Sequence, residues 1–238
     1  MIEELKNKGY RNLHMLSRGV DRTLFSPRQR SEKLREKWGV NKTEKVVVTV
    51  SRIAAEKNLN LTCSLTNEMI SQGKAKAGVI VGDGPELKKL KQKFPELHFT
   101  GCLSKQALAE HYASGDVFLF SSVTETFGNV VTEALASGTP VVAYDYAAPS
   151  EFIEENINGF LAPLSDEGVL KKKLNEILSL DFKILAEFKE AAQKSTQKAD
   201  WDFILQKFHT DLLGIIKNDK NHNLSGISPS RKTQPHPA

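Results

Sequence analysis

Short apolar runs alternate along the chain with longer segments in which apolar residues recur every three or four positions. The short runs are typical of buried strands and the longer segments of amphipathic helices. The pattern predicts strands at 45–50, 77–81, 97–100, 117–120, 140–143 and 159–162. It predicts helices at 59–72, 85–94, 105–114, 129–137, 148–154, 166–178, 182–197 and 201–216. Alternation of this kind predicts an α/β fold with a parallel sheet built from βαβ units.

Polar or glycine-containing turns follow five of the predicted strands directly. They hold Arg52, Gly82, Ser104, Glu125 and Asp145. In an open parallel sheet the carboxyl ends of the strands lie at one edge, and ligands bind beyond that edge. The sequence therefore predicts one binding site, assembled from several loops.

Two carboxylates, Glu125 and Glu133, flank the start of the helix predicted at 129–137, with seven residues between them. Gly128 lies between them and allows backbone N–H groups to approach a ligand at a helix N-terminus, where unpaired donors and the helix dipole favour anionic oxygen. Amides suit phosphates and carboxylates suit hydroxyls. The segment predicts a site for a polyhydroxyl ligand that carries phosphate.

Arg52 and Lys57 form an Arg-x4-Lys element after the strand predicted at 45–50. Together they place a planar donor fork and a point charge at the same edge of the sheet. Taken alone, the pair is equally well read as a surface arginine and a helix lysine. The Glu-x7-Glu element downstream favours a binding role.

Embedded in a strand, a turn and a helix, Glu125-x7-Glu133 resembles the signature of retaining glycosyltransferases of family 4, which have the GT-B fold. The wording of 124–130 and 136–144 is most similar to bacterial GDP-mannose-dependent mannosyltransferases. The resemblance implies a single Rossmann-like, doubly wound parallel sheet, the C-terminal half of a GT-B fold. It implies a hexosyltransferase whose donor is a nucleotide sugar, with GDP-mannose favoured.

The resemblance also assigns roles to residues. Glu133 would accept hydrogen bonds from ribose hydroxyls and Glu125 would contact the transferred sugar, while Arg52 and Lys57 would stabilise the leaving diphosphate. Glu125, Arg52 and Lys57 are thus the expected catalytic residues. Phe127 is equally well read as a packing residue. The donor contacts that the resemblance implies are Arg52, Lys57, Gly82, Leu103, Ser104, Glu125, Thr126, Phe127, Gly128, Asn129, Val130 and Glu133.

Three parts are expected along the chain. Residues 1–27 form a linker-like entry, whose 19–27 portion resembles the family's Gly-Val-Asp-x-x-x-Phe-x-Pro segment; residues 28–217 form the nucleotide-sugar-binding domain, and residues 218–238 a disordered polar tail. A complete GT-B enzyme has a second, N-terminal domain that binds the acceptor, a lipid or a saccharide. We expect this chain to be the donor-binding half alone, which binds nucleotide but transfers sugar slowly or not at all.

Length, charge and composition limit the cellular compartments and the binding partners that are expected. The chain has 238 residues and a net charge of +4, no apolar run of membrane-spanning length and no signal-peptide pattern, so the cytoplasm is the expected compartment. Lysines cluster at 88–93 and 171–173. They are read as solvated helix faces, with weak attraction to the anionic inner face of a membrane as the alternative. No basic stripe is interleaved with aromatic residues, which argues against nucleic acid.

Metal and redox chemistry have no support in the sequence. The two cysteines show no disulfide or zinc pattern, and no Asp-x-Asp is present to clamp a nucleotide through a divalent metal. We expect neither metal nor cofactor, the nucleotide sugar being a substrate.

Several alternatives stay open. The donor could be a UDP-sugar. A nucleotide-sugar epimerase shares the two-domain fold, and a non-catalytic module would bind nucleotide without chemistry. A glycosidase acid/base pair fits less well, since it needs two carboxylates facing each other across one bond. The dinucleotide fingerprint Gly-x-Gly-x-x-Gly is missing, which counts against an NAD enzyme.

Overall fold

The computed structural model describes residues 2–11, 13–14, 16, 18–124 and 128–221. The chain divides into two compact units, one comprising Ser17–Phe203 and the other Met1–Leu16 with Ile204–Ala238. The larger unit contains the sheet and all the predicted site residues that the structure describes.

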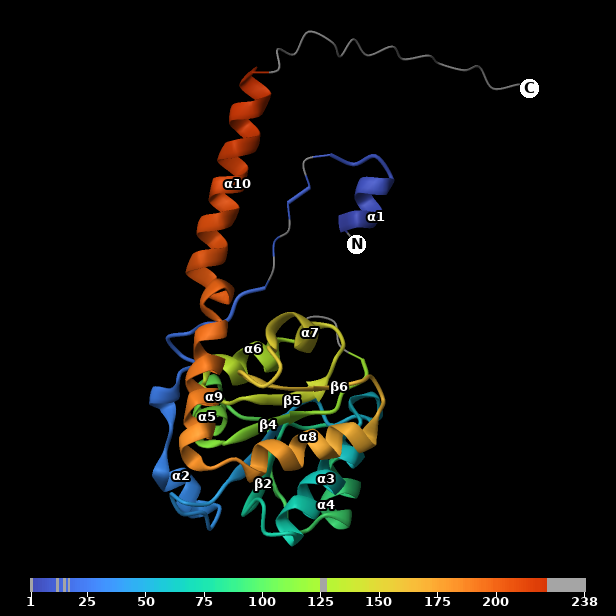
Figure 1. The fold of residues 1–238 in the computed structure, drawn as a ribbon, viewed down its shortest axis with the longest axis vertical. Helices are drawn as coiled ribbons and strands as arrows, with labels where there is room; N and C mark the ends of the chain where they lie inside the picture. The colour runs from blue at the N-terminus through green and yellow to red at the C-terminus, as the bar shows by residue number, and fades with distance from the viewer. Residues whose placement is uncertain (1, 12, 15, 17, 125–127, 222–238) are drawn as a thin grey trace, which may run out of the picture. The chain divides into compact units, whose positions relative to one another are not determined.

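The larger unit is built on a six-stranded sheet in which every neighbouring pair is parallel (Figure 1). Its spatial order is β3-β2-β1-β4-β5-β6, so the chain winds outward from β1 in one direction and from β4 in the other. This confirms the predicted Rossmann-like, doubly wound parallel sheet. The strands are β1 (Val46–Val50), β2 (Ala77–Val81), β3 (His98–Gly101), β4 (Val117–Phe120), β5 (Val141–Tyr144) and β6 (Gly159–Ala162).

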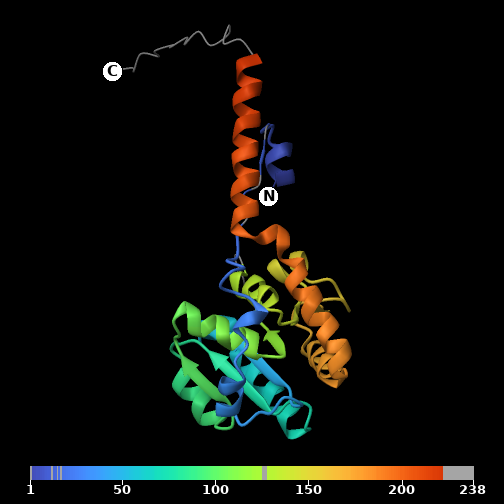
Figure 2. The same cartoon turned by 90° about the vertical axis from the view of Figure 1, so that its left-hand side faces the viewer.

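Helices that precede, connect and follow these strands cover both faces of the sheet (Figures 1 and 2). They are α2 (Glu32–Lys37), α3 (Leu59–Ser71), α4 (Leu87–Lys93), α5 (Lys105–Ser114), α6 (Asn129–Ala136), α7 (Ala148–Phe152), α8 (Glu167–Ser179) and α9 (Phe182–Ser195), with short 3-10 helices η1 (Pro27–Gln29), η2 (Ala55–Lys57) and η3 (Gln197–Ala199). The predicted strands and helices are all present, and their ends differ by up to two residues, except for the helix predicted at 201–216, which extends to Asn221. The sequence pattern missed the helix at Ile2–Asn7, α2 and the 3-10 helices, which are too short to show a period.

Alternate residues of each strand point to opposite faces of the sheet, and each face has its own hydrophobic core. Val46 and Val48 of β1 pack on the face covered by α5 and α6, whereas Val47 packs on the face covered by α3 and α8. Every residue of β1, β2, β4 and β5 is buried. Strands covered on both faces need apolar residues at successive positions, which is why they read as unbroken apolar runs.

The segment at 18–27, which the sequence predicted as the linker-like entry to the domain, is part of the larger unit. The Val20 amide donates to the Ala199 carbonyl at 2.8 Å, and Phe25 is buried in the core that α5 and α6 cover. A turn precedes Phe25. It is stabilised by the Asp21 carboxylate, which accepts hydrogen bonds from the Thr23 and Leu24 amides, both at 3.0 Å.

The smaller unit contains α1 (Ile2–Asn7) and most of α10 (Trp201–Asn221). The α10 helix passes the predicted end at 216 and includes 218–221, which the sequence assigned to the polar tail. The rest of that predicted tail lies outside the described residues. Over the described ranges, no helix is both long and apolar enough to cross a membrane.

Candidate functional site

The carboxyl edge of the sheet reverses its winding between β1 and β4, and the loops after these two strands lie side by side there. The first loop runs through 51–58 and contains Arg52 and Lys57. The second runs from Ser121 through Thr124 toward α6. The crevice at such a reversal is where open α/β sheets bind ligands. A ligand bound here would contact residues of both loops.

Lys57 connects the two loops. Its Nζ donates a hydrogen bond to the carbonyl oxygen of Thr124 at 2.9 Å. Thr124 in turn donates from Oγ1 to the Glu56 carbonyl at 3.1 Å, and Ser122 donates from Oγ to the Thr124 carbonyl at 2.8 Å. The structure thus places the Lys57 ammonium group at the reversal, on η2, two residues before α3 begins.

Arg52 lies on the same loop with its side chain 65% exposed, and its guanidinium is paired with the Glu56 carboxylate. An exposed ion pair of this kind contributes little to stability. The guanidinium can therefore exchange Glu56 for another anion at small cost. Arg52 and Lys57 both lie in the segment 51–58 after β1, and Glu56 is an additional charge there that was not considered from the sequence.

The residue after Lys57 has an unusual backbone. Asn58 adopts φ +53°, in the left-handed region that asparagine tolerates better than most residues. Its carbonyl accepts a hydrogen bond from the Ser121 hydroxyl at 3.1 Å, and that hydroxyl is also bonded to Thr62. These contacts fix the loop after β1 against the end of β4. Asn58 and Ser121 were missed from sequence, although an asparagine directly before a helix is a recognisable signal.

Gly82 allows the loop after β2 to approach the loop after β1. It adopts φ +136°, and a Cβ at this position would lie 1.9 Å from the Ser51 carbonyl oxygen. The Ser51 amide donates to the Val81 carbonyl at 3.0 Å and the Ile53 amide to the Asp83 carbonyl at 2.8 Å. Only glycine fits such an approach. The structure therefore gives Gly82 a role in shaping the edge on which Arg52 lies.

The start of α6 faces the same edge. Gly128 precedes the helix at φ +64° and is its N-cap residue, a position where most helices carry a polar side chain. Asn129 is exposed and Val130 is half-buried. Backbone N–H groups at the beginning of a helix attract anions. Glu125, Thr126 and Phe127, which the sequence also placed here, lie outside the described residues.

Glu133 lies one turn into α6 and is half-buried. The Tyr112 hydroxyl donates a hydrogen bond to its Oε2 at 3.0 Å. Burial raises the pKa of Glu133 to about 7, against the opposing effects of the Tyr112 hydrogen bond and the nearby charge of Lys105. Tyr112 was not singled out from sequence, since it lies 21 positions away and reads as a core residue.

Leu103 and Ser104 follow β3 and lead into α5. The Ser104 hydroxyl accepts a hydrogen bond from the Ala107 amide at 3.3 Å and so caps α5. Leu103 is half-buried and packs against the core that α5 and α6 cover. Both side chains therefore have structural partners, which leaves their backbone groups as the means of contacting a ligand.

A buried ion cluster lies at the opposite, amino edge of the sheet. The Asp116 carboxylate, 2% exposed, contacts Arg35 at 2.8 Å and Lys189 at 2.6 Å, and it accepts the Val46 amide at 2.9 Å. Although burial alone would raise the pKa of Asp116, the charges of Lys189 and Arg35 prevail and hold it below its usual value. The cluster joins α2, α9, β1 and β4, and is structural.

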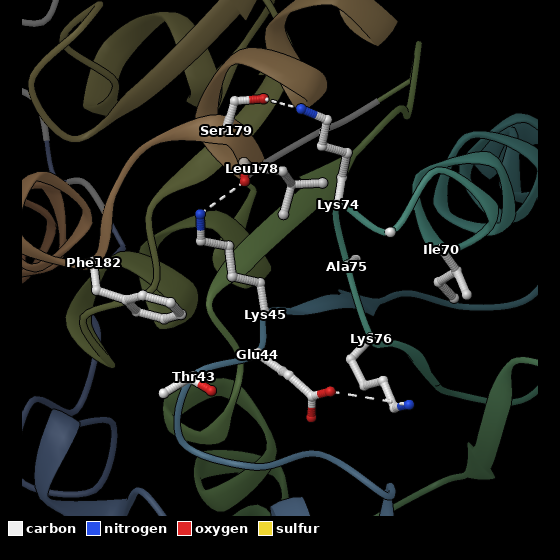
Figure 3. A pocket seen from close by; sticks show the side chains of 11 residues that line it. Thr43, Glu44, Lys45, Ile70, Lys74, Ala75, Lys76, Leu178, Ser179 and Phe182 are labelled. Carbon is white, nitrogen blue, oxygen red and sulfur yellow. Dashed lines mark hydrogen bonds and ion pairs between the residues drawn. The ribbon is translucent and has the colours of Figure 1, made fainter.

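The amino edge also has a cavity of about 550 Å³ (Figure 3). Lys45 lines it and donates to the Leu178 carbonyl at 2.7 Å, and Lys74 donates to the Ser179 hydroxyl at 3.0 Å. These lysines bind the carbonyl end of α8 and the hydroxyl beside it, as cations at a helix C-terminus do. The cavity lies away from the predicted site. Within the described part of the chain, no three His, Cys, Asp or Glu residues are grouped so as to hold a metal.

Comparison with known families gives one match. The family described as Glycosyl transferases group 1 matches residues 30–195. The chain is 32% identical over 229 residues to the GDP-mannose-dependent alpha-mannosyltransferase of Corynebacterium glutamicum, covering 96% of this chain and 54% of that protein. It is 39% identical over 165 residues to the protein of the same name from Mycobacterium tuberculosis, covering 69% and 42%. The chain thus spans about half the length of these relatives or less.

Solved structures share the fold. Anabaena Alr3699/HepE in complex with UDP-glucose matches with a TM-score of 0.69 at 26% identity, over 82% of this chain and 56% of that one. Sucrose-phosphate synthase from Thermosynechococcus elongatus matches with a TM-score of 0.72 at 21% identity, over 86% and 53%. The second likeness concerns the fold alone.

Proposed function

The chain belongs to the glycosyl transferases group 1 family, and on that premise we propose that its carboxyl edge binds a nucleotide sugar, with GDP-mannose as the donor. Two relatives at 32% and 39% identity are named GDP-mannose-dependent alpha-mannosyltransferases. The wording of 124–130 supports the same donor. A UDP-sugar is the competing donor, because a structure with the same fold was solved with UDP-glucose.

The observation that carries the proposal is the position of Lys57. Its ammonium group lies at the reversal of the sheet, hydrogen-bonded at 2.9 Å to Thr124, and the start of α6 faces the same edge. We propose that Lys57, Arg52 and the first amides of α6 hold the donor diphosphate. Positive groups fixed there would stabilise the charge that develops on the leaving nucleotide. In this proposal these cations take the role of a divalent metal.

The carboxylates would bind the hydroxyl groups. We propose that Glu133 accepts hydrogen bonds from the ribose and that Glu125 contacts the transferred sugar, which passes to its acceptor with retention at the anomeric carbon. The proposal for Glu125 comes from the family resemblance. That for Glu133 is supported in addition by its place on α6, with one carboxylate oxygen already held by Tyr112.

The relatives are about twice as long as the matched segment, so a second domain is part of the proposal. It would bind the acceptor, a lipid or a saccharide, and this chain alone would bind nucleotide with little or no transfer. We place the protein in the cytoplasm, with the lysine clusters at 88–93 and 171–173 giving at most weak attraction to the inner face of the membrane.

Calorimetric titration of the chain with GDP, UDP and ADP tests the donor site. The same titrations are repeated with Glu133→Ala and with a matched control, Glu187→Ala, which removes an exposed glutamate from α9. We expect GDP to bind in preference to the other two, Glu133→Ala to lose that binding, and the control to retain it.

Selective binding of UDP would keep the site and overturn the GDP-mannose assignment. No binding of any nucleotide would overturn the proposal that this chain forms a donor site by itself. When the chain is joined to an N-terminal domain, sugar transfer with release of nucleotide would support the transferase. Interconversion of sugar isomers would instead identify an epimerase.

A further inference from the structure

The contact between Tyr112 and Glu133 joins a fully buried group to the candidate site. The Tyr112 side chain is 0% exposed, and its hydroxyl donates to Glu133 Oε2 at 3.0 Å. Across the described ranges this is the one hydrogen bond that the Glu133 side chain makes. It occupies Oε2 and leaves Oε1 to accept a hydrogen bond from elsewhere. A carboxylate can accept at both oxygens, so the two contacts are compatible.

Tyr112 is itself fixed from several directions. Its ring contacts Phe25 edge-on, with centroids 5.9 Å apart, and Phe118 of β4 at 5.6 Å. Its carbonyl accepts a hydrogen bond from the Thr139 hydroxyl at 2.7 Å. A ring held this way has one orientation, so the direction of its O–H is nearly fixed as well. The glutamate side chain, which otherwise samples several rotamers, receives its orientation from Tyr112.

We propose that Tyr112 is the positioning residue of the donor site: its hydroxyl holds the Glu133 carboxylate so that Oε1 is presented to the hydroxyl groups of the nucleotide. The proposal rests on the proposed function, which makes Glu133 a ligand of the nucleotide. Fixing a binding group before the ligand arrives reduces the entropy lost on binding and so raises affinity. The segment at 18–27 takes part through Phe25, whose ring packs on that of Tyr112.

The contact also affects the charge state of Glu133, although burial has the larger effect. Within the described part of the chain, the groups that act on its titration are Tyr112 and Lys105, both on α5. Burial raises the pKa of Glu133 to about 7, and the hydrogen bond from Tyr112 opposes that rise. Because an ionised carboxylate is the better acceptor, nucleotide affinity should increase as the pH rises through about 7. Removing the Tyr112 hydroxyl should move this midpoint to higher pH.

The test is GDP titration of the wild-type chain, Tyr112→Phe, Glu133→Gln and the double variant across a range of pH. We expect Tyr112→Phe to bind GDP about tenfold more weakly at neutral pH, from the loss of one hydrogen bond to a charged group. The loss should shrink at high pH, where Glu133 ionises in either protein. Glu133→Gln should abolish the pH dependence, and Tyr112→Phe should add little loss in that background.

Tyr144, at the end of β5, provides a matched control for Tyr112. Tyr144 is also a buried tyrosine, but its hydroxyl makes no hydrogen bond to any residue that the structure describes. Tyr144→Phe removes the same atom without removing a contact, and we expect GDP affinity and its pH midpoint to stay at the wild-type values. A second variant, Glu133→Asp, keeps the charge but withdraws the carboxylate from Tyr112. We expect it to lose affinity as Tyr112→Phe does.

A ligand-free measurement separates the outcomes. The midpoint of Glu133 ionisation, followed by carbon-13 NMR of its carboxyl group, should be higher in Tyr112→Phe than in the wild-type chain. An unchanged midpoint would overturn the positioning role whether or not nucleotide binds. If the midpoint moves and the wild-type chain binds no nucleotide, the proposed function fails, and with it the role of Tyr112 toward a ligand. An affinity loss in Tyr112→Phe that is equal at every pH would show a merely structural effect and overturn the proposal.

Discussion

The Nζ of Lys57 lies 2.9 Å from the carbonyl oxygen of Thr124, and this hydrogen bond joins the loop after β1 to the loop after β4. The two residues are 67 positions apart and meet where the sheet reverses its winding. A cation at this point serves two purposes. It fixes the two loops relative to each other, and in the proposed function it also binds the diphosphate of the donor.

Replacing Lys57 by alanine should weaken GDP binding by roughly tenfold or more, since a charged hydrogen bond contributes about 1.5–3 kcal/mol. Isothermal titration calorimetry measures the change. Lys37→Ala is the matched control, because it removes an exposed lysine at the end of α2, a helix that lies before β1 in the chain and so away from the carboxyl edge. Equal losses in the two variants would point to a general effect of charge and contradict the local role of Lys57.

Glu133→Gln should stabilise the ligand-free chain at high pH. The folded pKa is raised to about 7 from the ordinary 4.5, so between these values the folded chain binds more protons than the unfolded chain. The free energy of unfolding then falls as pH rises through this interval. Because Glu133 is only half-buried, we expect a gain of roughly 1–3 kcal/mol for Glu133→Gln above neutral pH and almost none in acid.

Urea unfolding of the wild-type chain and Glu133→Gln at several pH values measures that difference. A difference that stays constant with pH would contradict the raised pKa. Together with the expected loss of GDP binding, a gain in stability would show that the carboxylate is retained for a ligand at a cost to the fold.

Asp116→Asn should lower the free energy of unfolding by about 3–5 kcal/mol, because Arg35 and Lys189 would stay charged without their buried partner. Chemical denaturation at neutral pH measures the loss. The comparison is Glu190→Gln, which breaks the exposed ion pair with Lys194 and should leave the free energy of unfolding almost unchanged. Similar losses in both variants would contradict the structural role assigned to the buried cluster.

Gly82→Ala should disturb both the fold and the site. The added Cβ would lie 1.9 Å from the Ser51 carbonyl oxygen, at a φ of +136° that side chains rarely adopt. We expect a loss of at least about 2 kcal/mol in stability, with weaker GDP binding because the loop that carries Arg52 must move. Thermal unfolding and titration calorimetry measure the two effects.

Gly168→Ala provides the opposite expectation. Gly168 lies in the first turn of α8, and its added Cβ would come no closer than 3.4 Å to the Asp166 carboxylate. Alanine favours the helix, so stability should rise by up to about 1 kcal/mol with GDP binding unchanged. A loss for Gly168→Ala as large as that for Gly82→Ala would show that the close approach at Gly82 is not the cause.

The pattern of apolar residues was enough to predict the strands of the sheet and the edge at which the ligand is proposed to bind. Val46–Val50 and Val117–Phe120 are unbroken apolar runs, and only strands covered on both faces bury every residue of such a run. Once the strands are known to be parallel, the residues that follow them must share one edge. For that reason Arg52, Lys57, Gly82 and Glu133 could be grouped before any contact was known.

Which of those residues contact each other, and which side chains orient them, could be seen only in the folded structure. No sequence signal near Glu133 predicts its contact with Tyr112, and none near Asp116 predicts its contact with Arg35. Arg35 reads as a surface residue on a short charged helix, but its side chain is 0% exposed. Sequence periodicity reports which face of an element is buried, because burial follows local spacing. The partner of a buried polar group is set by how distant elements pack, and that pairing leaves no periodic trace in either segment.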